Sequence, residues 1–193
     1  MTQVRGTPAS GKTILAKLLH HYILQQEPRC MVLRLCAWKL KEDMKEGGWH
    51  DWLWESHFWD AEDGSVLIVD EAQGSYWDTS FWIHIKDINK DSRHRIVTLA
   101  SYGSTGTNPA VTTPYSPPLT QVVGLYAFDH GDGNKAGLLL SSDEFHDFIK
   151  KKFQGHCFEE EFLKGIHELT AGHVGACQDV IAVLQAHSVS HTH

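Results

Sequence analysis

The sequence lacks the features that mark several classes of protein. No apolar run is long enough to cross a membrane, and nothing resembling a signal peptide precedes the first motif. The fourteen histidines form no HExxH motif and no CxxC pair occurs, so we expect no structural metal site. The scattered cysteines predict a reducing, intracellular compartment, the cytoplasm or the nucleus, with each thiol packed as a small core residue: Cys30, Cys36, Cys157 and Cys177.

Basic charge is also scarce. The 17 Lys and Arg residues face 24 Asp and Glu residues, which gives a formal net charge of −7 at pH 7. Such a molecule is not attracted as a whole to nucleic acid or to an anionic membrane. The single basic run, Lys150-Lys151-Lys152, is interpreted as a solvated helix end. The 193 residues suffice for one domain with a sizeable core, or for one domain with a small appendage.

The first informative motif begins at the fifth residue of the sequence. Arg5 to Thr13 read RGTPASGKT, in which Gly6 is followed after four residues by Gly11-Lys12-Thr13. The backbone of such a turn cradles phosphate oxygens, and the helix after it points its positive end at them. The pattern predicts that Lys12 reaches the β- and γ-phosphates and that the Thr13 hydroxyl binds Mg²⁺. The predicted nucleotide-binding residues are Gly6, Thr7, Pro8, Ala9, Ser10, Gly11, Lys12, Thr13 and Ile14.

An acidic strand end provides the second element. In SVLIVDEAQ, four consecutive apolar residues, Val66 to Val69, are followed by Asp70 and Glu71. A continuous apolar run is typical of a parallel strand buried on both faces. Paired with the loop, it predicts that Asp70 holds Mg²⁺ and that Glu71 polarises a water for attack on the γ-phosphate. Lys12 and Glu71 are therefore candidate catalytic residues.

A third polar strand end follows in RIVTLASYGS. A neighbouring parallel strand here would bring Ser101, together with Tyr102 or Ser104, close to the γ-phosphate. Ser101 is accordingly a candidate catalytic sensor. The alternative is that its hydroxyl only satisfies a strand end, and the sequence leaves both interpretations open.

The remainder of residues 1–130 alternates strands and helices. The helix after the loop is expected to bury one apolar face, made of Ile14, Leu15, Leu18, Leu19, Tyr22 and Ile23. The other expected elements are a strand over 30–38, a short amphipathic helix within 39–64, a helix over 79–89, a surface loop over 103–118 and a strand over 119–128. The first strand is expected to be a stub, because Gln3 and Arg5 are poor core residues.

Four of the seven tryptophans gather in the irregular segment before the acidic strand: Trp49, Trp52, Trp54 and Trp59. Two interpretations are open for this cluster. It packs on the flank of the sheet, or it forms a surface that binds a protein partner.

The last part of the chain is helical. Ser141 and Glu144 form a capping box for a helix through residue 153, and helices over 158–169 and up to 187 follow, separated by TAGHVG. Strands alternating with helices, then helices alone, predict a three-layer α/β domain that carries a helical lid. We expect a core over 1–130 and a lid with a short tail over 131–193.

Several motifs together suggest a family. RGTPASGKT, LIVDEAQGSYWD, LASYGS, GLLLSSDEF and LTAGHVGA occur in an order that resembles the ATPase domain of crinkler-type proteins of fungi and oomycetes, which is related to the AAA and STAND ATPases. The resemblance implies ATP as the nucleotide and a parallel sheet in the order 5-1-4-3-2. It also implies that Gly172-His173-Val174-Gly175 packs near the base, which makes His173 a candidate nucleotide contact. In many STAND relatives a proline stands in the place of Val174.

The chain departs from this family in two ways. Its arginines, Arg5, Arg29, Arg34, Arg93 and Arg95, fall neither in the loop after LASYGS nor in the lid, where AAA-type enzymes place an arginine finger. Slow hydrolysis is therefore expected unless Arg93 or Arg95 acts on a neighbouring molecule. Crinkler proteins often join the module to a translocation segment or a nuclease-like domain, and neither is present here. We expect an isolated module or a fragment of a longer protein.

Three functions follow from these observations. The first is a Mg²⁺-dependent ATPase that couples nucleotide state to a change of shape or to assembly, as part of a crinkler-type effector that acts in a host cell if it is secreted. The second is a switch that binds ATP or ADP without hydrolysis and gates a protein partner. The third, a small-molecule kinase, ranks last because phosphate-loop kinases carry an arginine-rich lid.

Overall fold

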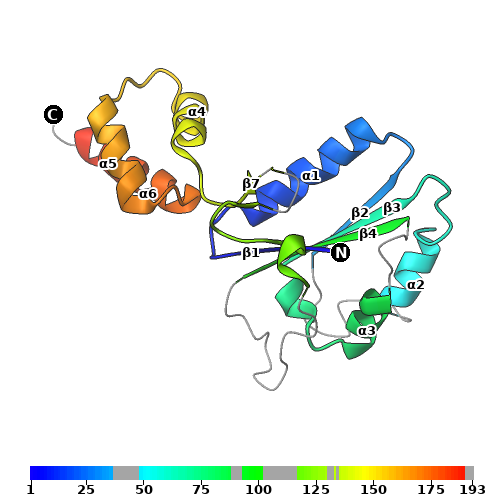
Figure 1. The fold of residues 1–193 in the computed structure, drawn as a ribbon. Helices are drawn as coiled ribbons and strands as arrows, with labels where there is room; N and C mark the ends of the chain where they lie inside the picture. The colour runs from blue at the N-terminus through cyan, green and yellow to red at the C-terminus, as the bar shows by residue number, and fades with distance from the viewer. Residues whose placement is uncertain (37–47, 88–92, 102–116, 130–132, 134, 190–193) are drawn as a thin grey trace.

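The computed structural model describes residues 1–36, 48–87, 93–101, 117–129, 133 and 135–189 (Figure 1). Its centre is a five-stranded sheet in the order β2-β3-β4-β1-β5, in which all neighbouring strands are parallel. The strands are β1 (Thr2–Gly6), β2 (Met31–Cys36), β3 (Ser65–Asp70), β4 (His94–Ser101) and β5 (Val122–Val123). The expected order 5-1-4-3-2 is the same order counted from the other edge, so this prediction is confirmed.

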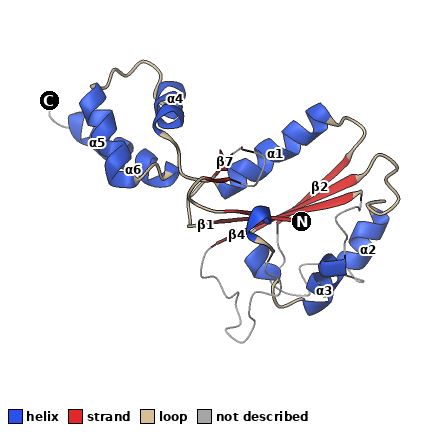
Figure 2. Cartoon of the chain, in the orientation of Figure 1, coloured by secondary structure: helices blue, strands red, loops and turns tan. Residues whose placement is uncertain are grey.

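Helices cover both faces of the sheet (Figure 2). Helix α1 (Lys12–Gln26) packs on one face, and α2 (Gly48–Glu55) and α3 (Thr79–Asp87) pack on the other. All six residues of β3 are buried because it is flanked by two strands and covered on both faces. The three-layer α/β architecture is therefore confirmed. Residues 88 and 89, the expected end of the third helix, lie outside the described residues.

The apolar face of α1 is narrower than expected. Ala16 and Ile23 are buried, but Ile14, Leu18 and Tyr22 are 57%, 60% and 60% exposed. A helix on a flat sheet buries one row of residues three or four apart, and that row runs through Ala16, so the row through Leu18 turns to solvent. The prediction that all six apolar residues pack inward was wrong for these three.

The first strand is short but lies inside the sheet, between β4 and β5. Gln3 is only 1% exposed, so the expectation that it is a poor core residue was wrong. The position between β4 and β5 buries Gln3, while Arg5 in the same strand stays half-buried. The strand expected over 119–128 is present only as β5, because a 3₁₀ turn precedes it and pairing with β1 stops at Val123. After Val123, the carbonyl of Gly124 accepts a hydrogen bond from Leu138 N at 3.0 Å.

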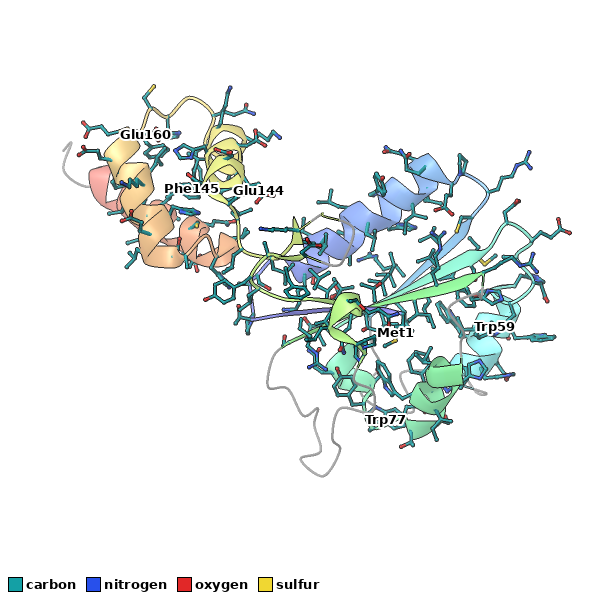
Figure 3. The ribbon with its side chains drawn as sticks, in the orientation of Figure 1. Met1, Trp59, Trp77, Glu144, Phe145 and Glu160 are labelled. Carbon is teal, nitrogen blue, oxygen red and sulfur yellow. The ribbon has the colours of Figure 1, made fainter. Side chains whose placement is uncertain are left out.

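The tryptophan cluster packs mainly on the flank of the sheet. Trp49 is buried, and Trp52 and Trp59 pack against the same apolar cluster on the α2–α3 side (Figure 3). Trp54 does not belong to this cluster and is 61% exposed. The expectation of buried thiols holds for Cys30 and Cys177. It fails for Cys36, the last residue of β2, and for Cys157, which are both exposed.

The lid consists of α4 (Ser142–Lys152), α5 (Glu160–Thr170) and α6 (Val174–Val189), beside the start of α1 (Figure 1). The expected capping box at Ser141 and Glu144 is present, with both reciprocal hydrogen bonds. The lid has its own apolar cluster around the fully buried Phe145 (Figure 3). Lys150-Lys151-Lys152 are exposed in the last turn of α4, as expected.

Smaller elements complete the chain. The 3₁₀ turn η2 (Ala72–Ser75) follows β3, and η3 (Leu119–Gln121) precedes β5, while an antiparallel pair, β6 (Phe128–Asp129) with β7 (Lys135–Ala136), lies between β5 and α4. Among the described residues, no helix has the length and apolar character needed to span a membrane.

Candidate functional site

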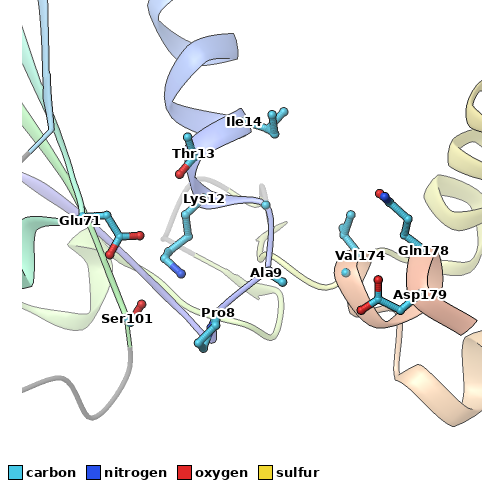
Figure 4. A pocket seen from close by; sticks show the side chains of 12 residues that line it. Pro8, Ala9, Lys12, Thr13, Ile14, Glu71, Ser101, Val174, Gln178 and Asp179 are labelled. Carbon is cyan, nitrogen blue, oxygen red and sulfur yellow. The ribbon is translucent and has the colours of Figure 1, made fainter.

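The candidate site lies where three parallel strands end. Gly6 at the end of β1 is in register with Ser101 at the end of β4, and Asp70 ends β3 next to β4. Because carboxyl ends of parallel strands meet at one edge, residues far apart in the sequence converge here. A pocket of about 570 Å³, lined by Ser101, opens between this edge and the lid (Figure 4). That volume lies within the range of small-molecule sites.

The loop after β1 has a backbone that few residues adopt. Gly11 caps α1 with a φ of 86°, and Ala9 has a φ of 59°. A positive φ at a residue with a Cβ costs on the order of 1–3 kcal/mol, and such strain gathers at functional sites. A Cβ at Gly6 would overlap the Ser10 hydroxyl and the Leu138 side chain, so any larger residue there would force these side chains to move. No side chain caps α1, which leaves its positive end facing the pocket.

Lys12 is held over the loop. Its Nζ donates to the carbonyl oxygen of Thr7 at 2.8 Å and to that of Gly6 at 3.4 Å. Burial lowers the pKa of Lys12, while the carboxylates of Glu71 and Asp70 act in the opposite direction. The lysine is thus a desolvated cation in front of two acids, which suits an anionic ligand.

The acids at the end of β3 differ in environment. Asp70 is 4% exposed, and its Oδ1 accepts a hydrogen bond from Glu71 N at 3.1 Å. Glu71 has a left-handed backbone, with a φ of 53°, which turns its side chain into the pocket. Gln73 joins Glu71 to β4, because its Nε2 donates to Glu71 Oε2 and its Oε1 accepts from Ser101 N at 3.2 Å. No role was predicted for Gln73 from the sequence, although it stands in the motif LIVDEAQGSYWD two residues after Glu71.

The lid forms the opposite wall of the pocket. Val174, Gly175, Gln178 and Asp179, from the first turns of α6, face the loop (Figure 4). Sequence analysis missed Gln178 and Asp179. Their spacing of four residues from Val174 and Gly175 was the available signal, because residues four apart share a helix face.

The predicted residues fall into two groups. Those that line the pocket are Pro8, Ala9, Gly11, Lys12, Thr13, Ile14, Glu71 and Ser101. Those that lie around it without lining it are Gly6, Thr7, Ser10, Asp70 and His173. The imidazole of His173 is engaged elsewhere, with Nε2 at 2.8 Å from Thr7 Oγ1 and Nδ1 at 3.2 Å from Ala176 N. Tyr102 and Ser104 lie outside the described residues.

The arginines stand away from this pocket within the described part of the chain. None lines it, and the two proposed fingers lie at the amino end of β4, the end opposite Ser101. Arg93 donates to the carbonyl of Glu62 at 2.8 Å, and both terminal nitrogens of Arg95 bind the carboxylate of Glu27.

Comparison with solved structures identifies the fold of this chain. No protein-family model and no curated protein matches the chain. Among solved structures, domain III of the replication initiation protein DnaA from Thermotoga maritima is similar over 99% of this chain and 78% of that chain, with a TM-score of 0.56 and 17% identity. The strand order and the flanking helices are those of the P-loop NTPase α/β fold that DnaA domain III shares.

Two further solved structures match with lower scores. A RuvB variant from Thermotoga maritima has a TM-score of 0.49 and 16% identity over 95% of this chain and 56% of that chain. The Hsp104–ADP complex from S. cerevisiae has a TM-score of 0.45 and 14% identity over 97% of this chain and 40% of that chain. This chain therefore spans about half of the RuvB chain and less than half of the Hsp104 chain.

Proposed function

We propose that this protein is a Mg²⁺-dependent P-loop ATPase module. The observation that carries the proposal is the convergence of Lys12, Glu71 and Ser101 on one pocket, at the carboxyl edge of a parallel sheet and beside a strained loop. A cation, an acid and a strand-end hydroxyl around a helix N-terminus suit binding and attack at a terminal phosphate.

The residues around the pocket fit a magnesium ion. Magnesium takes oxygen ligands and keeps several waters. Thr13 offers a hydroxyl at the pocket, and Asp70 offers a buried carboxylate close enough to Lys12 to act on its charge. We assign these two residues to the ion, which would neutralise charge on the phosphates when bound.

Other residues of the pocket would bind the phosphates, position the attacking water and contact the base. Lys12 neutralises phosphate oxygens, and the backbone of the loop orients them. Glu71 accepts a hydrogen bond from the attacking water and holds it in line, while Ser101 contacts the γ-phosphate. On the other side of the loop, the apolar side chains of Ile14 and Val174 suit a flat base, with Gln178 and Asp179 at its polar edge. ATP as the preferred nucleotide follows from the crinkler resemblance.

Hydrolysis by a single molecule should be slow. No arginine lines the pocket among the described residues, and an arginine finger accounts for roughly a thousandfold or more in rate. Arg93 or Arg95 would have to come from a second molecule, so we propose that self-association completes the site.

A second candidate, a switch without hydrolysis, is favoured by one observation. The carboxylate of Glu71 is occupied by the amide of Gln73, which is a weaker arrangement for a base than a free carboxylate. In that case ATP or ADP binds and the lid changes its contact with a partner.

The wider setting of the module is proposed on the sequence motifs. We assign it to a crinkler-type effector, with a core over 1–130 and a lid and tail over 131–193. It would act inside a cell, in the host if the longer protein is secreted.

The test is phosphate release from Mg-ATP across protein concentrations, with Glu71→Gln as the matched variant. The glutamine keeps the size of the side chain and cannot act as a base. The ATPase is supported if the rate of phosphate release per protein molecule rises with protein concentration and if Glu71→Gln releases no phosphate. Binding of nucleotide without phosphate release by either protein favours the switch. Absence of binding by the unmodified protein overturns both.

A further inference from the structure

A chain of hydrogen bonds runs from the pocket lysine to the lid. Lys12 Nζ donates to the Thr7 carbonyl at 2.8 Å, and the hydroxyl of the same threonine lies 2.8 Å from Nε2 of His173. His173 directly precedes α6, and its carbonyl accepts from Cys177 N at 2.9 Å, so it is the N-cap of that helix. Thr7 thus contacts the site on one side and a lid helix on the other.

The other ring nitrogen fixes the chemistry of this link. Ala176 N donates to Nδ1 of His173 at 3.2 Å, and Nδ1 must carry no proton to accept it. In the neutral ring the proton is then on Nε2, which donates to Thr7 Oγ1. The imidazole is therefore held at both ends, as the side-chain cap of α6 and as a donor to the phosphate loop.

A second contact keeps loop and helix together. Gly175 N donates to the carbonyl of Ala9 at 3.2 Å, and a Cβ at Gly175 would come within 2.6 Å of the Ala9 side chain. The first turn of α6 is thus in direct contact with the loop at two adjacent points. A shift of the loop must move α6 or break these bonds.

We propose that His173 is a positioning residue that couples the phosphate loop to the lid. The inference rests on the proposed function, since a nucleotide supplies the displacement. A phosphate attracts the Lys12 ammonium more strongly than a neutral carbonyl does. When Lys12 turns to the phosphate, Thr7 loses its donor and its peptide reorients, and the bond to His173 transmits this change to α6.

The test measures the distance between core and lid. Cys36 and Cys157 are exposed, one at the end of β2 and the other between α4 and α5, so both can carry nitroxide labels for double electron–electron resonance. Thr7→Val removes the hydroxyl and keeps the branched shape, and Thr7→Ser keeps the hydroxyl as the matched control. His173→Asn keeps an N-cap acceptor for Ala176 N but is too short to reach Thr7.

We expect one narrow distance distribution in the unmodified protein and in Thr7→Ser, which shifts when Mg-ADP is added. Thr7→Val, His173→Asn and the double variant should share a broader distribution that does not shift. The dissociation rate of a fluorescent ADP analogue should rise roughly two- to tenfold in each single variant, as for one lost hydrogen bond, and no further in the double variant.

Two results would overturn the coupling. One is a shift with Mg-ADP in His173→Asn that equals that of the unmodified protein, and the other is a double variant whose effects are the sum of the two single effects. If the unmodified protein binds no nucleotide, the proposed function fails separately. In that case the widths of the distance distributions without ligand test the coupling. Equal broadening in the three variants supports it, and an unchanged width in both single variants overturns it.

Discussion

The side chain of Gln73 holds the carboxylate of Glu71 with one end of its amide and the backbone of β4 with the other. The acid that sequence analysis assigns to water is therefore positioned by a neighbour from the 3₁₀ turn that follows it. Because the amide is anchored on Ser101 N, the orientation of Glu71 depends on the end of a different strand.

Replacement of Gln73 tests this dependence. We expect Gln73→Ala to lower kcat for phosphate release by about tenfold, because a base that is free to rotate spends less time in line with its water. Nucleotide affinity should stay within about twofold, since Gln73 does not line the pocket. The measurement is steady-state phosphate release with a separate titration of ADP binding. A rise in kcat would mean that the amide holds Glu71 away from water.

The charge of Lys12 predicts a dependence on pH. Burial lowers the pKa of this ammonium below its ordinary value of 10.5. Only the protonated form of Lys12 attracts phosphate. The affinity for ADP should therefore be highest below the lowered pKa and fall as the pH rises through it, at a lower pH than an exposed lysine would give. Calorimetric titration with ADP between about pH 7 and about pH 10 measures the effect.

Lys12→Arg is the control for this prediction, because a guanidinium keeps its charge over the whole range. The affinity of Lys12→Arg for ADP should be lower than that of the unmodified protein at neutral pH and should stay constant as the pH rises. If the unmodified protein also bound ADP with constant affinity over this range, the predicted role of the ammonium would be wrong.

Two glycines of the lid offer a matched pair. A Cβ at Gly175 would come within 2.6 Å of Ala9, whereas a Cβ at Gly165 in α5 meets nothing within 4 Å. We expect Gly175→Ala to separate α6 from the loop and weaken ADP binding by at least about tenfold, as for a disturbed site. Gly165→Ala should leave binding unchanged and raise the free energy of unfolding by about 0.5–1 kcal/mol. Equal affinities in the two variants would contradict the contact.

The four cysteines should react in two classes. Cys36 and Cys157 are exposed, while Cys30 and Cys177 are buried, and burial raises the pKa of the Cys177 thiol. Iodoacetamide at neutral pH should therefore modify the first two thiols in the native protein and all of them in urea, because the thiolate is the reactive form. Mass spectrometry of the peptides counts the adducts, and a native adduct on Cys177 would show that the lid opens.

The elements predicted correctly from the sequence are those whose structure depends on residues close together in the chain. The run Val66 to Val69 can be buried only in a central strand, and Ser141 with Glu144 closes a capping box within one turn. The convergence of the loop with β3 and β4 was also accessible, because parallel strands place their carboxyl ends at one edge.

What escaped prediction depends on partners distant in the sequence. Leu18 and Tyr22 look like core residues until the sheet below α1 fixes which row is buried. Gln178 and Asp179 enter the site only because the lid docks on the loop. Nothing local distinguishes Thr7 from its neighbours, since its partner His173 follows 166 residues later.

The place of β1 in the sheet has a consequence for how the chain folds. Residues Thr2–Gly6 are synthesised well before their partners in β4, which are the residues from Val97 to Ser101. A nascent chain must hold β1 unpaired by β4 until β4 has emerged, and closing so long a loop is slow. The phosphate loop, attached to that strand, cannot take its shape earlier. A ribosome-bound chain shorter than β4 should therefore have no site at all.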